Sequence, residues 1–172
     1  DNIWTDTPAL PATQVYVLQK EYSRESMTDK LTRLRSAMEK EKCDIHVLTT
    51  LDDIAWLFNL RANDVESCPV FLSYAIITHT ETILFAGESA FDETVRSYLE
   101  ENGVVLKSYE TFYDNVRRLI SEGGLGKLLL CESRISYRLK KELEGATILD
   151  RQNPTSFMKS VKNETEQRNI RK

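Results

Sequence analysis

The stretch DIHVLTTLDDIAWLF, residues 44–58, changes its apolar pattern midway and decides the fold class. Its first part, Asp44–Thr49, is rich in β-forming residues and predicts a strand. From Leu51 to Phe58 the apolar residues are spaced for a short helix, and Thr50 or Asp52 stands where a helix cap is needed. The stretch therefore predicts strand, turn and helix, the unit of a mixed α/β domain.

Upstream of this stretch the sequence predicts one long helix, from Ser26 to about Lys42. A single apolar stripe at helical spacing marks it: Met27, Leu31, Leu34 and Met38. Ser26 and Asp29 resemble a capping box with Asp in place of Glu. Residues 1–25 carry Pro8 and Pro11 without periodicity, so they are expected to form an extended linker from a preceding domain.

Downstream, a loop is expected over Asn59–Cys68, followed by two apolar runs that pair as an antiparallel hairpin, Val70–Thr78 and Thr82–Ala86. The second half then alternates helix and strand: helix Ser89–Asn102, strand Val104–Tyr109, helix Glu110–Ser121, a turn at Gly123 and Gly124, strand Lys127–Cys131, helix Ser136–Leu143 and strand Ala146–Leu149. Such alternation implies parallel pairing. The fold class is therefore α/β, a mixed five- to six-stranded sheet with helices on its faces.

Composition excludes several classes of function. The chain has 172 residues, 41% hydrophobic, which suits one globular core. Its net charge of −4, with the basic residues dispersed, argues against nucleic acid as a partner. No run of about 20 apolar residues predicts a membrane span, and no signal peptide opens the chain. Three well-separated cysteines fit reduced thiols, so a cytoplasmic location is expected.

A search for catalytic groups finds none. His46 and His79 have no partner at metal-ligand spacing, and His46 is expected to be a half-buried strand residue. One acidic set could hold a divalent cation: Asp52, Asp53, Asp64 and Glu66. Adjacent carboxylates on a helix point about 100° apart, which favours one capping the helix and the other lying in solvent. We therefore predict no catalytic residue and no metal ligand in this chain.

The region from Trp56 to Phe71 stands out because an aromatic helix runs into a loop rich in donors and acceptors. Loops of this kind concentrate binding residues. A structural alternative has Arg61 and Asp64 paired to hold the loop.

The same region carries a resemblance. The run LDDIAWLFNLRANDV, residues 51–65, followed by Pro69–Phe71 and Ser73–Ile77, resembles the middle domain of three-domain cytosolic X-prolyl aminopeptidases. Lys30–Met38 is similar to that domain's first helix, and Lys159–Glu166 to the entry into the family's catalytic domain. The polar segment Glu164–Lys172 looks like the first turns of a helix, as in a fragment cut from a longer chain.

The resemblance implies a creatinase N-terminal, ribonuclease H-like domain over residues 26–158, with residues 159–172 beginning the connection to a catalytic domain absent from this sequence. It implies that the parent enzyme removes the residue preceding proline and holds two manganese ions in that absent domain. The fragment itself would have no cofactor and no activity.

Two residues depart from the family's pattern. Ala62 replaces a usual glycine, so a positive φ there would be strained. Cys68 stands where an asparagine is usual before Pro69.

The resemblance also implies roles and partners. Trp56, Arg61, Asn63 and Asp64 are the candidates for facing neighbouring domains or gating the substrate. The expected partners are neighbouring domains of the same chain and the parent's peptide substrate. For the parent, a second copy in a homodimer is a further candidate partner, whereas nucleic acid and membrane are not expected. Two alternatives stay open: a ribonuclease H-like domain that binds nucleic acid or metal, and a free-standing peptide-interaction module using Val70–Tyr74 and the hairpin edge.

Overall fold

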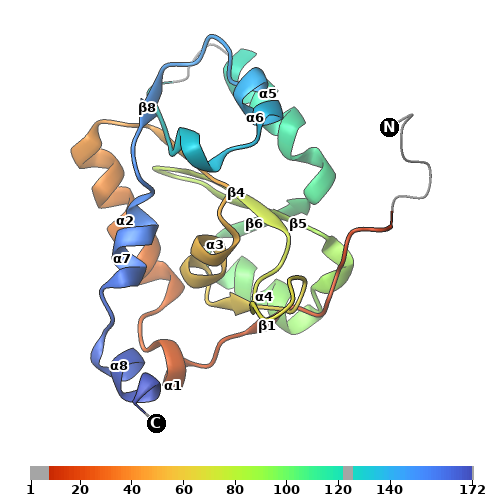
Figure 1. Ribbon diagram of the computed structural model, residues 1–172, viewed down its shortest axis with the longest axis vertical. Coiled ribbons are helices and arrows are strands. Elements are labelled where there is room, and N and C mark those ends of the chain that lie inside the picture. Colours follow the sequence, from red (N-terminus) through yellow and green to blue (C-terminus); the bar gives the residue numbers. More distant parts are fainter. Residues whose placement is uncertain (1–7, 122–125, 172) are drawn as a thin grey trace.

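A six-stranded mixed sheet runs through the centre of the computed structural model, which describes residues 8–121 and 126–171 (Figure 1). In spatial order its strands are β6 (Val104–Ser108), β5 (Thr82–Ala86), β4 (Ser73–Thr78), β2 (Ile45–Leu48), β7 (Leu128–Leu130) and β8 (Ile148–Asp150). The pairs β2–β4 and β4–β5 are antiparallel, and β5–β6, β2–β7 and β7–β8 are parallel. The predicted mixed sheet with an antiparallel hairpin is confirmed.

Helices cover both faces of the sheet, because successive side chains of each strand point to opposite faces. Ala75 and Ile77 of β4 join the core cluster under α2 (Met27–Glu41), α3 (Leu51–Leu57) and α4 (Glu93–Glu101). Ile76 faces the other way, into a second cluster under α5 (Phe112–Ser121) and α6 (Tyr137–Glu142). The core therefore has two halves, one on each side of the sheet.

The central strand β2 is buried along its whole length, and this corrects the expectation for His46. That side chain is 0% exposed, not half-buried, because β2 has strands on both sides and helices over both faces. Its Nδ1 lies 2.9 Å from the carbonyl oxygen of Leu129, and its Nε2 has no hydrogen-bond partner among the described residues. Burial lowers the pKa of His46 to about 4.

Most predicted helices are confirmed, with shifted boundaries. The hydroxyls of Ser26 and Ser136 cap α2 and α6 by accepting the amides of Asp29 and Leu139. The helix predicted from Ser89 begins later, since residues 88–90 form a 3₁₀ turn and Asp92 caps α4. A 3₁₀ turn over residues 109–111 likewise delays α5. The turn predicted at Gly123 and Gly124 lies outside the described residues.

The N-terminal segment is more ordered than a linker. Val15 is 1% exposed, and its amide donates to the carbonyl oxygen of Ala90 at 2.8 Å. The next residues form β1 (Tyr16–Val17), which pairs antiparallel with β3 (Leu60–Arg61) in a separate two-stranded sheet. A two-residue strand has no periodicity to detect, so both strands were expected as irregular chain.

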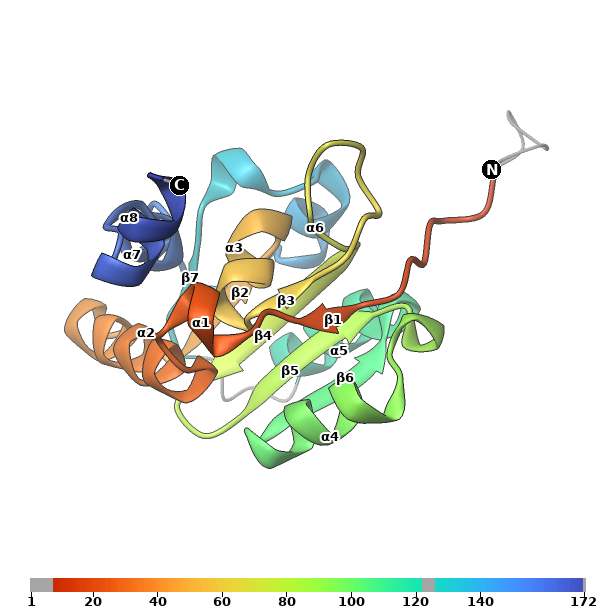
Figure 2. The same ribbon diagram turned by 90° about the horizontal axis from the view of Figure 1, so that it is seen from below.

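A group of short helices gathers beside α2 at one end of the molecule (Figure 2): α1 (Lys20–Ser23), α7 (Pro154–Ser160) and α8 (Glu164–Ile170). The expected helical turns after Glu164 are confirmed as α8. Helix α7 runs across the boundary expected between residues 158 and 159.

The peptide-interaction surface predicted at Val70–Tyr74 and the hairpin edge is not present in the described part of the chain. Strands β4 and β5 are both internal, so the hairpin offers no free edge; β6 and β8 are the edge strands of the described sheet. Val70, Phe71 and Ser73 are 5%, 1% and 1% exposed. Phe71 and Ser73 fill the core, and the nearly buried Val70 only borders a groove, so this segment does not form the exposed surface that the alternative needs.

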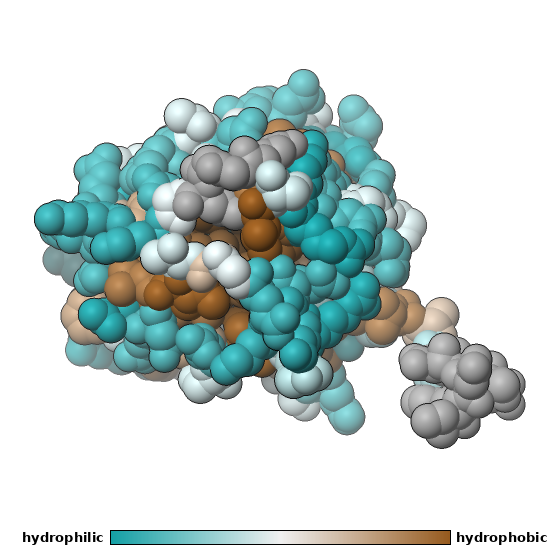
Figure 3. All heavy atoms as spheres, turned by 90° about the horizontal axis from the view of Figure 1, so that it is seen from above, coloured by the Kyte–Doolittle hydropathy of each residue, from teal (hydrophilic) through white to brown (hydrophobic). Residues whose placement is uncertain are grey.

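Polar residues cover most of the face seen in Figure 3, with hydrophobic residues showing in a band across it. No helix within the described ranges has both the length and the apolar character needed to cross a bilayer.

Candidate functional site

A groove of about 490 Å³ opens between the segment that follows α3 and the C-terminal helices. One wall carries Trp56, Arg61 and Pro69, and the other carries Lys162 and Ile170. Two of the four predicted site residues thus line one concave surface. The volume lies within the range of about 300–1,000 Å³ that is usual for ligand pockets.

Arg61 is a partly buried cation in this groove. Its Nη1 donates to the carbonyl oxygens of Ala55 and Leu60 at 2.6 and 2.8 Å. Within the described ranges, Nε and Nη2 have no hydrogen-bond partner, and no carboxylate oxygen lies within 4.0 Å of the guanidinium. Burial lowers the pKa of Arg61, although an arginine stays charged in proteins.

Trp56 is held in place by Lys30, which reaches through the core from α2. Lys30 is 1% exposed; its Nζ donates to the carbonyl oxygen of Trp56 at 2.8 Å and to Oδ1 of Asn59 at 2.6 Å. The same nitrogen lies 4.3 Å from the centroid of the Trp56 ring, within cation–π range. Burial lowers the pKa of Lys30 to about 8, while Glu25 and Glu166 act to raise it.

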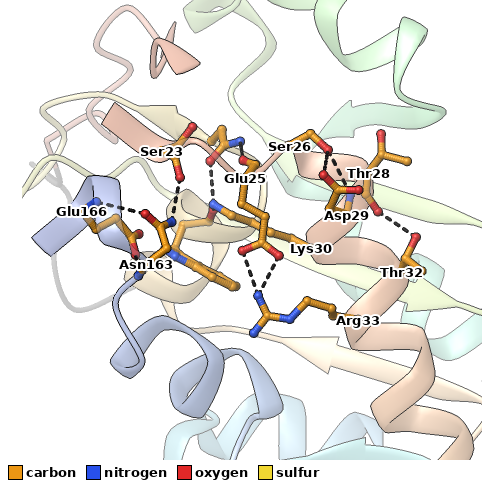
Figure 4. Close-up of polar contacts among 12 residues, drawn as sticks. Ser23, Glu25, Ser26, Thr28, Asp29, Lys30, Thr32, Arg33, Asn163 and Glu166 are labelled. Atoms are coloured by element: carbon orange, nitrogen blue, oxygen red, sulfur yellow. Dashed lines mark hydrogen bonds and ion pairs between the residues drawn. The ribbon is translucent and has the colours of Figure 1, made fainter. Parts of the chain in front are cut away.

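Lys30 was missed as a site residue, although the pattern contains a signal. It lies on the buried stripe of α2, with Met27 one turn before it and Leu34 one turn after it. A lysine on an apolar stripe is unusual, because lysine is almost never fully buried without partners. The surroundings appear in Figure 4, where Glu25 pairs with Arg33 beside Lys30.

Asp53 forms a second buried polar group, between α3 and α7. Its carboxylate is 1% exposed and accepts hydrogen bonds from the hydroxyls of Thr50 and Ser156, both at 2.7 Å. Its Oδ1 lies 2.9 Å from Nζ of Lys159. Burial acts to raise the pKa of Asp53, but Lys159 and the hydroxyl donors outweigh it and the pKa is lowered.

Of the two adjacent carboxylates Asp52 and Asp53, one was expected to cap the helix and the other to lie in solvent; only the second expectation is confirmed. Asp52 is exposed, with 61% of its side chain accessible, and it also contacts Lys159. Asp53 does not cap the helix, since Thr50 is the cap residue; instead it clamps α7 onto α3. Sequence alone gave no sign of the partner, which lies 106 residues further along.

Asp64 and Asn63 lie away from the groove. The carboxylate of Asp64 accepts from the amide and hydroxyl of Thr13 at 2.8 and 2.6 Å, and from the amide of Leu72 at 2.9 Å. Asn63 is exposed, and its backbone amide donates to the Thr13 hydroxyl oxygen. The predicted Arg61–Asp64 pair is wrong: Asp64 fastens the N-terminal segment to the loop, and Arg61 points elsewhere.

Ala62 and Cys68, the two residues that depart from the family's pattern, lie in unstrained positions. Ala62 is 0% exposed and has no positive φ, so its side chain brings no backbone strain. Positive φ values occur instead at Asn59 and Ser67. Cys68 lines the groove as a free thiol.

Helix α8 is fixed to the N-terminal part of the domain. Asn163 caps it, accepting from the amides of Thr165 and Glu166, and Glu166 accepts the Asn163 amide in return. The Nδ2 of Asn163 donates to the carbonyl oxygen of Ser23 at 3.0 Å (Figure 4). The second wall of the groove is therefore attached to α1.

The described residues do not fit a two-metal centre. Within residues 8–121 and 126–171, no group of three or more His, Cys, Asp or Glu side chains could hold a metal ion. The expected acidic set is dispersed, because Asp53 binds Lys159 and Asp64 binds Thr13.

The sheet order and the groove define a class: a mixed α/β domain with a concave surface beside its C-terminal helices. The chain belongs to the Creatinase/Prolidase N-terminal domain family, whose model matches residues 6–166.

Similar proteins extend this result. The probable Xaa-Pro aminopeptidase P of Neurospora crassa is 37% identical over 180 residues, covering 100% of this chain and 26% of that protein. The relative of the same name from Metarhizium robertsii is 37% identical over 183 residues, covering 99% of this chain and 30% of that protein. The chain thus spans less than a third of the length of these curated relatives.

Solved structures agree on the fold. The crystal structure of X-prolyl aminopeptidase from Caenorhabditis elegans, described as a cytosolic enzyme with a di-nuclear active site, superimposes with a TM-score of 0.91 at 25% identity. The match covers 99% of this chain and 28% of that one. An Xaa-Pro dipeptidase from Bacillus anthracis gives 0.57 at 15% identity, covering 83% and 38%, which supports the fold alone.

Proposed function

We propose that this chain is a non-catalytic domain of an Xaa-Pro aminopeptidase that supports neighbouring domains and limits access of peptides to their catalytic centre. The observation that carries the proposal is the apolar surface left on the C-terminal helices. Phe157, Val161 and Ile170 are 71%, 63% and 70% exposed. These three side chains lie close together in the sequence, and exposed apolar patches are typical of contact surfaces.

The polar anchors of these helices support the same role. Asp53 and Lys159 fix α7 to α3, and Asn163 fixes α8 to α1. A contact surface on helices held in this way would hold a neighbouring domain in one orientation. The parent enzyme would be cytoplasmic, would carry the two manganese ions in another domain, and could act as a homodimer; these remain predictions from the resemblance and the relatives.

The test compares the longer enzyme with altered forms of this surface. Phe157→Asp and Val161→Asp should lower cleavage of Xaa-Pro peptides or weaken discrimination against long peptides, because each places a charge in the contact. Tyr137→Asp on α6 is the matched control, since Tyr137 is 75% exposed but lies on another helix. Manganese-dependent cleavage by the 172-residue chain alone would contradict the proposal, as would equal effects of all three substitutions.

The ribonuclease H-like alternative has no support from the described residues, which offer no acidic metal set. We do not propose it.

A further inference from the structure

Arg61 is a partly buried cation that forms no ion pair with any described carboxylate. Two backbone carbonyl groups satisfy Nη1, and the remaining guanidinium nitrogens have no partner in the part of the chain that the structure describes. Partly buried charges are costly to hold unless an opposite charge or further hydrogen bonds compensate them. Two acidic side chains line the same groove: Asp52 contacts Lys159, while Glu166 accepts the backbone amide of Asn163 and forms no ion pair with Arg61, although its charge acts to raise the Arg61 pKa.

The walls around Arg61 are mostly apolar. Trp56 and Val70 are 6% and 5% exposed and form one side together with Pro69, while Tyr22 and Ile170 are 50% and 70% exposed at the rim. The only other cation of the groove without a carboxylate partner among the described residues is Lys162. The groove thus combines apolar walls with a guanidinium and an ammonium group that have no carboxylate partner among the described residues, beside the charged side chains of Asp52, Lys159 and Glu166.

From this geometry we infer that the groove binds a peptide segment that presents a carboxylate to Arg61 between apolar side chains. An arginine binds a carboxylate through two parallel hydrogen bonds, and Nε and Nη2 provide the two free donors on one edge of the guanidinium. The apolar neighbours of the carboxylate would pack on Trp56, Pro69 and Ile170. Resting on the proposed function, we assign the segment to another part of the longer polypeptide that carries this domain.

Charge complementarity selects this occupant. A purely apolar segment would leave Arg61 covered and unpaired, and a basic segment would place like charges together in a partly dry site. A free carboxylate without apolar neighbours would leave Trp56 and Ile170 unused.

The test titrates the 172-residue chain with two peptides, acetyl-Ala-Leu-Glu-Leu-Ala-amide and its Glu→Gln counterpart, followed by nuclear magnetic resonance of the Trp56 indole and Arg61 Nε signals. We expect the Glu peptide to bind at least about tenfold more tightly, since a charge-assisted hydrogen bond contributes about 1.5–3 kcal/mol. Arg61→Gln should abolish that preference. Arg96→Gln is the matched control, because Arg96 also donates to two backbone carbonyls, those of Phe91 and Glu88, but lies outside the groove.

Several results would overturn the inference: equal binding of the two peptides, binding of neither, loss of preference in Arg96→Gln, or self-association of the chain through the groove. If Arg61→Gln fails to fold, Arg61→Lys serves instead, with the preference reduced but retained and weakened by added salt. In the longer enzyme the groove should be filled, so binding of the Glu peptide there as tightly as to the 172-residue chain would overturn the assigned source. These readouts do not use catalysis, so they are independent of the test of the proposed function.

Discussion

The burial of His46 makes the stability of this domain depend on pH in a way that one substitution can isolate. Its pKa falls from an ordinary 6.5 to about 4, chiefly by burial, while the Leu129 carbonyl and Asp53 oppose the shift. A second proton on the ring would have no acceptor among the described residues, since Nε2 has none. The folded state therefore keeps the neutral ring, with Nδ1 donating to the Leu129 carbonyl oxygen.

The sign of the effect follows from proton linkage. Well above pH 6.5 the ring is neutral in both states, so its titration there has no effect on the free energy of unfolding. As the pH falls from 6.5 toward 4, the unfolded chain takes up a proton that the folded chain refuses, and stability is lost. Between pH 7 and pH 5 the loss is about 2 kcal/mol, and below pH 4 it approaches about 3 kcal/mol.

Urea unfolding of the wild type and of His46→Gln at pH 7, 6 and 5 measures this loss. The variant is expected to be less stable at pH 7, because the packing of β2 is altered, but its stability should fall less on acidification, by about 2 kcal/mol between pH 7 and 5. Carboxylates that titrate in both proteins cancel in the comparison. Parallel pH curves for the two proteins, or a His46 resonance that titrates near pH 6.5 in the folded state, would refute the reasoning.

Three further substitutions test other parts of the structure by the free energy of unfolding. Lys159→Met removes the cation beside buried Asp53 and should lower the free energy of unfolding by about 2–4 kcal/mol. The control Lys140→Met breaks the exposed pair with Glu132 and should cost less than about 1 kcal/mol. Similar costs for the two variants would contradict a stabilising role of the contact between Asp53 and Lys159. Lys30→Met leaves the Trp56 carbonyl oxygen and Asn59 Oδ1 without their donor and should lower the free energy of unfolding by about 2–3 kcal/mol. The Trp56 fluorescence, measured in a Trp4→Phe background, should also shift. An unchanged spectrum would count against Lys30 as the residue that holds the ring in place. Gly126→Ala would drive a Cβ into the carboxylate of Asp44 and should cost about 1 kcal/mol or more. Gly87→Ala, whose Cβ would lie 3.7 Å from Cβ of Ala12, should be near neutral, and the reverse order would be inconsistent with the packing at Gly126.

Periodic elements were predictable from sequence, and elements defined by distant partners were not. The apolar stripe of α2 and the capping serines gave the long helix and α6, since these signals lie within one or two turns of chain. The two-residue strands β1 and β3 exist only because they pair across 43 to 45 residues, so no local pattern reveals them.

The site shows the same contrast between residues marked by a local sequence pattern and residues placed by distant partners. Trp56 and Arg61 were selected by an unusual local composition, and they do share a groove. Asp64 was selected on the same grounds but binds Thr13, 51 residues away, and serves the packing of the loop. The other wall of the groove belongs to helices near residue 160, whose position depends on the buried contact between Asp53 and Lys159.

The small sheet of β1 and β3 also has a mechanical consequence. Tyr16 lies opposite Arg61, and Val17 opposite Leu60. Strand β3, which carries Arg61, is therefore paired with the N-terminal segment. Tension applied to residues 8–14 would reach β3 through this short ladder and through the link from Thr13 to Asp64. A pull from that side would therefore be shared between the strand that carries Arg61 and the turn before α4, where the Val15 amide donates to the carbonyl oxygen of Ala90.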